Sequence, residues 1–374
     1  MKKSIFAVAV ASVLTLGAAH AETVLYGSIR YDYESKKVEN TLKNGSWDGE
    51  RLSNLEDAGS RIGLKGSEDL GNGNAVIYNL EWGFNGMDSE ASGFKNRLAI
   101  LGLTGNWGTF TAGRQHNPFK VTIVDDAIVD DFNGSNVISS AAQRAMTTTL
   151  KGTKIGTTVN SDGKLAIQKA DYSRVGKVIA YTTPDWAGFQ ANVALMMDDT
   201  LYKTNDEKNI DLWTINARYA YDLGASGTIL AKAGYIQGKL ADVNKSKAWG
   251  LFLGYDQDAF GVSVDYANGN HKAKLNAENA VEGPKEKSQG WDIGARFSFG
   301  PNYYSTIRAT YGQNQVKVDG EKDKVKSWAI GFEQKLSSRT RAWVEYGQEE
   351  TKFAAVNVDK KKDNTISIGM RHDF

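Results

Sequence analysis

Apolar and polar side chains alternate position by position along most of the chain. Near the C-terminus, for example, Ile366, Ile368 and Met370 alternate with Thr365 and Ser367. A period of two arises when one face of a β-strand meets an apolar medium and the other meets water. The pattern recurs sixteen times and predicts strands, most of them ten to thirteen residues long, at 24–34, 59–68, 74–85, 95–104, 107–115, 174–184, 188–198, 210–222, 227–238, 245–256, 260–270, 288–299, 303–314, 325–336, 340–350 and 363–374.

The segments that connect these strands alternate between short and long. The short ones carry turn residues and lie at 69–73, 105–106, 185–187, 223–226, 257–259, 300–302 and 337–339. The long ones are polar and lie at 35–58, 86–94, 116–173, 199–209, 239–244, 271–287, 315–324 and 351–362. Tight turns at one rim and long loops at the other are typical of an antiparallel up-and-down barrel, and an even strand number fits a bacterial single-chain barrel.

Alternation alone does not choose between a soluble β-sandwich and a membrane barrel. The placement of aromatic residues favours the barrel, because they gather near both ends of the predicted strands. Near the long loops lie Tyr33, Trp82, Phe84, Trp213, Tyr235, Tyr266, Trp291, Tyr311, Trp328 and Tyr346, and near the tight turns lie Tyr26, Trp107, Trp186, Tyr221, Tyr255, Phe299, Tyr303 and Phe374. Two such belts indicate two interfaces between water and lipid.

The N-terminus predicts export. Lys2 and Lys3 precede an apolar run from Ile5 to Ala19, which ends in the cleavage-site pattern Ala19-His20-Ala21. The run is shorter than the roughly 20 residues of a membrane-spanning helix. We therefore expect residues 1–21 to be a cleaved signal peptide and residues 22–374 to form the barrel, located in the outer membrane of a Gram-negative bacterium.

Composition narrows the possible functions. Mean hydropathy is −0.44 and 24% of the residues are charged, which suits either a secreted β protein or a barrel whose strands are half polar. The chain has no cysteine, which excludes disulfides and thiolate chemistry. Loss of the two signal-peptide lysines changes the net charge only from +1 to −1, so no nucleic-acid partner is expected.

Catalytic motifs are missing from the sequence. It contains neither G-x-S-x-G nor H-E-x-x-H. Of the histidines after the signal peptide, His116 and His271 lie in predicted loops and His372 lies on the outward face near the terminus. We therefore predict no enzymatic activity, no cofactor and no metal site.

Six stretches of the chain resemble the general porins of Gram-negative bacteria, closest to the neisserial and betaproteobacterial branch. They are T-V-L-Y-G-S-I-R at 23–30, G-S-R-I-G-L-K-G-S-E-D-L-G-N-G at 59–73, N-R-L-A-I-L-G-L at 96–103, G-T-F-T-A-G-R at 108–114, S-R-V-G-K-V-I-A-Y-T-T-P-D-W-A-G-F at 173–189 and the terminal aromatic residue. The resemblance implies a homotrimer of 16-stranded barrels, each with a pore narrowed by its third extracellular loop. The third long connection, 116–173, is by far the longest, which supports this independently. A Thr/Lys/Gly-rich insert at 147–164 departs from the family.

Charged residues are the candidates for the pore constriction. Alternation places on the inward face of the strands Arg30, Arg61, Lys65, Arg218, Lys232, Arg296, Arg308, Arg341 and Arg371. The resemblance implies that Arg61, Arg97 and Arg174 line the constriction, with Arg114 as a neighbouring candidate. Because basic residues outnumber the inward acids, an anion preference is expected.

The third loop supplies the opposite charge at Asp125, Asp126, Asp130 and Asp131. Carboxylates facing an arginine cluster would set a transverse field across the pore. The alternative is that the inward arginines pair with Glu81, Glu333 or Glu345 and only hold the wall, and that the loop aspartates are solvated.

These observations predict an outer-membrane general diffusion porin that passes ions and small hydrophilic solutes. Its expected partners are further copies of the chain, outer-membrane lipids and lipopolysaccharide. Two alternatives stay open, a substrate-specific channel and a non-conducting adhesive or structural barrel. Against the first, Trp343 and Phe252 are the two large inward aromatics, too few for a sugar slide. Against the second, sixteen strands leave a water channel.

Overall fold

The computed structural model describes residues 22–42, 45–87, 93–151, 158–159, 165–166, 173–197, 210, 212–240, 243–276, 281–354 and 358–374. The predicted signal peptide, most of the insert at 147–164 and the whole connection at 199–209 lie outside these residues.

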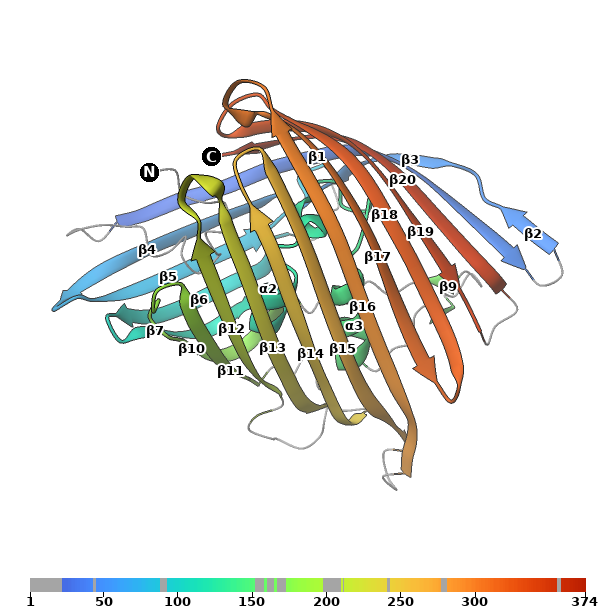
Figure 1. Ribbon diagram of the computed structural model, residues 1–374, viewed down its shortest axis with the longest axis horizontal. Helices are drawn as coiled ribbons and strands as arrows, with labels where there is room; N and C mark the ends of the chain where they lie inside the picture. Colours follow the sequence, from blue (N-terminus) through green and yellow to red (C-terminus); the bar gives the residue numbers. More distant parts are fainter. Residues whose placement is uncertain are drawn as a thin grey trace.

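Sixteen antiparallel strands form a closed cylinder (Figure 1), because β1 pairs with β4 on one side and with β20 on the other. The predicted fold class is confirmed. The strands are β1 (Glu22–Leu42), β4 (Arg61–Gly71), β5 (Asn74–Gly83), β6 (Lys95–Gly105), β7 (Gly108–His116), β10 (Arg174–Thr182), β11 (Phe189–Met196), β12 (Leu212–Asp222), β13 (Thr228–Leu240), β14 (Val243–Asp256), β15 (Phe260–Asn276), β16 (Val281–Phe299), β17 (Ser305–Val318), β18 (Glu321–Lys335), β19 (Thr340–Lys352) and β20 (Val358–Asp373).

Short elements complete the rims. β2 (Gly45–Asp48) pairs with the far end of β1, and β3 (Leu52–Asp57) pairs with its middle. The tight turns include two 3₁₀ helices, η2 (Gly224–Ser226) and η3 (Pro301–Tyr303). The chain ends on the same rim, where Phe374 and Gly27 exchange backbone hydrogen bonds of 3.1 Å. Among the described helices, none is both long and apolar enough to span a membrane.

The strands on the long-loop side extend further than the sequence predicted. The connection at 315–324 is strand on both sides of a tight turn at Asp319-Gly320, where both residues have positive φ. The connections at 239–244, 271–287 and 351–362 are likewise mostly strand in their described parts. In the β17–β18 extension Val316, Val318 and Val325 are buried on the inner face and lysines lie on the outer face, so the outward apolar pattern that marks the strands does not continue there.

The outer surface carries an aromatic belt across β12–β19. Four tilted ring pairs make it, with centroid distances of 5.2–5.7 Å: Trp213–Tyr235, Trp249–Tyr266, Trp291–Tyr311 and Trp328–Tyr346. Register joins the pairs, since Tyr235 lies opposite Trp249, Tyr266 opposite Trp291 and Tyr311 opposite Trp328.

Two residues differ from the predicted belts. Trp249 belongs to the belt although the sequence analysis left it out. Tyr26 faces the lumen instead of lipid, because its hydroxyl donates to Asn79 Oδ1 at 2.7 Å and to Glu81 Oε2 at 3.1 Å.

The connection between β7 and β10, residues 117–173, is here called loop 3, and its helices lie inside the cylinder. It contains α2 (Pro118–Ile123), the 3₁₀ helix η1 (Ile128–Asp131) and α3 (Ala141–Lys151), followed by the short β8 (Thr158–Val159) and β9 (Leu165–Ala166). Figure 1 shows α2 and α3 within the ring of strands. The largest apolar core of the molecule is the contact between this loop and the inner wall.

Candidate functional site

A capped helix turns loop 3 into the lumen. Asn117 closes the base of the loop, because its backbone N–H donates to Ser173 O at 2.8 Å. Its side chain accepts the N–H of Phe119 at 3.1 Å and so caps α2, whose first residue is Pro118. An Asn cap followed by proline is a favoured helix start, and it directs the chain away from the line of β7.

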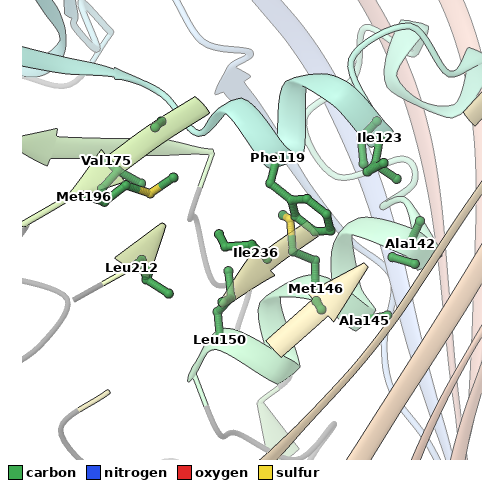
Figure 2. Packing of buried hydrophobic residues seen from close by; sticks show 14 of the residues in the cluster. Phe119, Ile123, Ala142, Ala145, Met146, Leu150, Val175, Met196, Leu212 and Ile236 are labelled. Atoms are coloured by element: carbon green, nitrogen blue, oxygen red, sulfur yellow. The ribbon is translucent and has the colours of Figure 1, made fainter. Parts of the chain in front are cut away.

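Apolar side chains seat the two helices of loop 3 on the wall of β10–β15. Phe119 and Ile123 of α2 pack with Met146 and Leu150 of α3, and all four are at most 1% exposed. Figure 2 shows them beside the wall residues Val175, Met196, Leu212 and Ile236. A water-facing barrel wall is normally polar, so this apolar patch marks where the loop rests.

Inward glycines make room for the loop. A Cβ at Gly234 would lie 2.9 Å from the Phe119 ring, and one at Gly250 would lie 2.8 Å from Ile123. At Gly290 and Gly347 an added Cβ would overlap the carbonyl oxygens of Ala141 and Val137. Glycine inside a strand often marks close approach by another backbone, and here these residues trace the path of loop 3.

Charged wall residues fasten the loop around half of the circumference. On β13, Lys232 Nζ donates to Asp126 at 2.6 Å and to Val121 O at 3.0 Å. On β19, Glu345 accepts the backbone N–H groups of Asn133 and Gly134. At the end of this path, Glu34 on β1 accepts the N–H of Asn136 at 2.9 Å. Charge-assisted bonds of this kind are roughly twice as strong as neutral ones.

Two buried carboxylates hold the start of α3. Asp265 and Asp292 lie directly opposite each other on β15 and β16 and are 1% and 2% exposed. Asp292 accepts the Ser140 hydroxyl at 2.8 Å and the N–H of Ala142 at 3.1 Å. Farther along α3, Arg144 is ion-paired with Glu349 of β19 at 2.5 Å.

The wall on the other side of the lumen is basic. Arg371 on β20 lies opposite Arg30 on β1, and Arg61 and Arg97 are close enough to act on the Arg30 charge. Glu81 on β5 is ion-paired with Arg97 at 2.5 Å and with Arg61 at 3.6 Å. We call Arg30, Arg61, Arg97 and Arg371 the basic wall.

The predicted pairing with Glu81 therefore coexists with a clustered positive charge, since one carboxylate serves two arginines. The side chains of Arg61 and Arg97 remain 27% and 18% exposed to the lumen. Fixed charge of one sign at a narrow passage lowers the cost of entry for ions of the other sign.

Three other predicted basic residues lie elsewhere. Lys65 lies on β4 nearer the tight-turn rim than Arg61, with its Nζ 5.3 Å from the centre of the Tyr26 ring. Arg174 lies at the base of loop 3, opposite His116 in register. Arg114 lies opposite Ala99, which alternates with the exposed Leu101, so register places it on the outer face of the barrel, where its Nε donates to Asn96 O at 3.1 Å.

Three of the four predicted loop aspartates, Asp125, Asp126 and Asp130, are paired with lysines instead of facing the basic wall unaccompanied. Lys120 of α2 is ion-paired with Asp125, and its Nζ lies 3.4 Å from Asp130 Oδ2. Lys232 of β13 is ion-paired with Asp126. Burial opposes the charge of Lys120, but Asp130 and Asp125 outweigh it and raise its pKa. Enclosure by the wall raises the pKa of Asp131 to about 6, although Arg308 and Arg296 oppose the shift.

Sequence reasoning missed Lys120, Glu34 and the pair Asp265 and Asp292. Hydrophobic alternation gave no signal for Lys120, because this residue and its partners Asp125 and Asp130 all lie in loop 3, outside the predicted strands. The inward aspartates could have been found, since they alternate with outward apolar residues on β15 and β16.

Comparisons with known proteins agree with this architecture. A family model described as Gram-negative porin matches residues 7–354. The chain is 27% identical over 394 residues to the major outer membrane protein P.IB of Neisseria meningitidis serogroup A / serotype 4A, and 28% identical over 390 residues to that of Neisseria lactamica, with 100% of each chain covered.

Two solved structures share the fold. The anion-selective porin from Comamonas acidovorans matches with a TM-score of 0.67 and 20% identity, over 95% of this chain and 100% of that one. OmpT of Vibrio cholerae in its trimer form matches with a TM-score of 0.64 and 14% identity, over 95% and 100%. The closed barrel, the inward loop and the family match together identify the chain as a member of the Gram-negative porins, which are channels of the outer membrane.

Proposed function

We propose that solutes and ions cross this porin between loop 3 and the basic wall, and that anions are preferred. The observation that supports this proposal is the basic wall of Arg30, Arg61, Arg97 and Arg371. It lies on the side of the lumen opposite the apolar contact of loop 3 with β10–β15. Glu81 is shared by two of these arginines, so net positive charge remains.

The loop strengthens this preference, because Lys120 and Lys232 offset much of its negative charge. The field across the passage is therefore set mainly by the basic wall. A structural relative is described as an anion-selective porin, which supports the same sign.

The reversal potential of the purified protein in a planar bilayer under a salt gradient tests the proposal. We expect a sign that reports anion preference. A cation-selective reversal potential would overturn it. Swelling of liposomes in a series of uncharged sugars tests general diffusion, for which rates should fall smoothly with solute size and not single out one sugar.

We also propose that three copies assemble, as in the trimer form of the structural relative OmpT. The aromatic belt covers β12–β19, and exposed aliphatic side chains predominate on the remaining wall, including Leu25, Leu101, Leu103, Ile368 and Met370. This wall offers the subunit contact. Single-channel recordings should show conductance steps in groups of three.

Export completes the proposal. Residues 1–21 act as a signal peptide, and the mature chain begins at Glu22, the first residue of β1. N-terminal sequencing of the protein from outer membranes should begin at Glu22. A chain that retains Lys2 and Lys3 in the outer membrane would contradict it.

A further inference from the structure

Two carboxylates lie side by side beneath the start of α3. Asp265 and Asp292 are directly opposite each other on the inner face of β15 and β16, and they are 1% and 2% exposed. Side chains at opposite positions of an antiparallel pair have Cβ atoms about 4.5–5.5 Å apart. Within the described part of the chain, Oδ1 of each aspartate is buried and has no hydrogen-bond donor. The two side chains form one enclosed acidic pair, which we call the aspartate pair.

The wall residues on either side of the aspartate pair are uncharged. The register places Phe252 of β14 beside Asp265 and Gly312 of β17 beside Asp292. A Cβ at Gly312 would overlap Asp292 Oδ1, so the carboxylate fills this space closely. Lys232 follows beyond Phe252 in the same row of the sheet, but its Nζ is ion-paired with loop 3 at 2.6 Å.

The charges that act on the aspartate pair from loop 3 do not neutralise it. Asp130 of η1 adds a further negative charge. Arg144 of α3 adds a positive charge, but this side chain is ion-paired with Glu349 of β19 at 2.5 Å. Each of these nearby cations therefore serves another carboxylate. Fully ionised, the aspartate pair would hold two negative charges in a dry site.

One shared proton removes this conflict. Burial disfavours each charge and like charges in contact repel, so two such carboxyl groups lose their protons in separate steps. With one proton bound, Asp265 donates a hydrogen bond to Asp292 and gives buried oxygen atoms the partner that they lack. Asp292 keeps the negative charge, because it accepts the Ser140 hydroxyl at 2.8 Å and the N–H of Ala142 at 3.1 Å.

The aspartate pair holds the start of α3 through Ser140. The hydroxyl that donates to Asp292 also accepts the N–H of Gln143 at 3.0 Å, and so it caps the helix. Asp265 Oδ2 lies 3.4 Å from the same hydroxyl. A second negative charge would drive the two carboxylates apart and draw water between the helix and the wall. Loss of the proton therefore loosens this end of α3.

We propose that the aspartate pair binds one proton, and that this proton keeps the start of α3 on the wall. When the pH is raised until the proton leaves, the start of the helix moves into the lumen and narrows the passage. Because one proton is released, the ratio of displaced to seated helix rises by up to about tenfold per pH unit. The inference goes beyond the proposed function and rests on the proposed passage only for its conductance readout.

Infrared spectra of the purified protein test the bound proton directly. A carboxylic acid absorbs apart from a carboxylate, so the native protein at about pH 8 should show an acid band that disappears as the pH rises further. Asp131, whose pKa is about 6, is ionised at this pH. Asp265→Asn keeps the shape and the hydrogen-bond donor without the acid, and should lack the band. Asp222→Asn, at an exposed carboxylate beside η2, is the matched control and should keep it.

Single-channel recordings test the link between the proton and the loop. As the pH is raised from about 7 to about 10, the native protein should spend a growing fraction of time in low-conductance states, by up to about tenfold per pH unit. Asp265→Asn should keep its neutral-pH conductance throughout, because its amide cannot ionise. Asp222→Asn should respond as the native protein does. Resistance of both variants to detergent unfolding shows that they fold.

Three results would overturn the proposal. One is an acid band in Asp265→Asn equal to that of the native protein. Another is a full alkaline response in Asp265→Asn, or none in the native protein. The third is an alkaline response that a chelator abolishes, which would assign the aspartate pair to a divalent cation. The infrared measurement does not depend on ion preference, so a cation-selective reversal potential would reject the proposed function alone.

Discussion

Glu345, on the inner face of β19, accepts the backbone N–H of Gly134 at 2.8 Å. The same carboxylate accepts the N–H of Asn133 at 2.9 Å and lies 3.7 Å from Arg308. It is 1% exposed, so its charge depends on these partners. One wall residue thus fixes the backbone of loop 3 more than two hundred positions away in the sequence.

Replacing Glu345 should loosen the loop. Glu345→Ala removes the acceptor of two backbone N–H groups and leaves Arg308 with less compensation, at a local cost of about 3 kcal/mol. We expect frequent brief conductance fluctuations in single-channel records. Glu350→Ala, on the outer face of the same strand, is the control, and its single-channel records should lack these fluctuations. Absence of the fluctuations in both variants would show that Glu345 does not fix loop 3.

Neutralising the basic wall should weaken anion preference. Arg61→Gln with Arg97→Gln removes two positive charges that share Glu81, so that carboxylate becomes uncompensated. The reversal potential should move toward cations. Arg114→Gln removes a charge that register places on the outer face and should leave the potential unchanged. A shift from Arg114→Gln as large as that of the double variant would contradict the assignment of the lumen.

The glycine at position 290 should be required for loop placement. An added Cβ there overlaps the Ala141 carbonyl, so Gly290→Leu must displace the start of α3 from the wall. We expect altered unitary conductance with the barrel still resistant to detergent unfolding. Ala309→Leu, on the outer face of the neighbouring β17, adds side-chain volume toward lipid and serves as the control. Native conductance in Gly290→Leu would show that the loop rests elsewhere.

Selectivity should depend on pH through Asp131. Because enclosure raises the pKa of its carboxyl to about 6, the neutral form becomes populated as the pH falls through that value. The loop then loses a negative charge, and anion preference should rise between about pH 7.5 and pH 5. Asp131→Asn, which is neutral throughout, should show a smaller rise. Identical pH profiles of reversal potential would assign the change to other groups.

The strands could be predicted from the sequence because lipid and water impose different side chains on their two faces. Ile330 and Phe332 point outward and Glu333 inward, as alternation requires. The extensions of β17 and β18 could not be predicted in this way, because their outer face carries lysines and their apolar residues, such as Val316 and Val325, are buried on the inner face.

The path of loop 3 depends on contacts between residues far apart in the sequence. Phe119 meets Gly234, and Asp126 meets Lys232, across more than a hundred residues. The family resemblance predicted an inward loop and an arginine wall, but the unbroken register of β6 and β7 places Arg114 on the same outer face as Phe110 and Ala112.

Chemical accessibility of position 61 tests the central claim most directly. The chain contains no cysteine, so Arg61→Cys and Ile330→Cys each introduce one thiol. A charged methanethiosulfonate reagent added to open channels should change the conductance of Arg61→Cys in discrete steps, because the side chain lines a water-filled lumen. It should leave Ile330→Cys unchanged, because that side chain faces lipid. Modification at 330 with none at 61 would contradict the account.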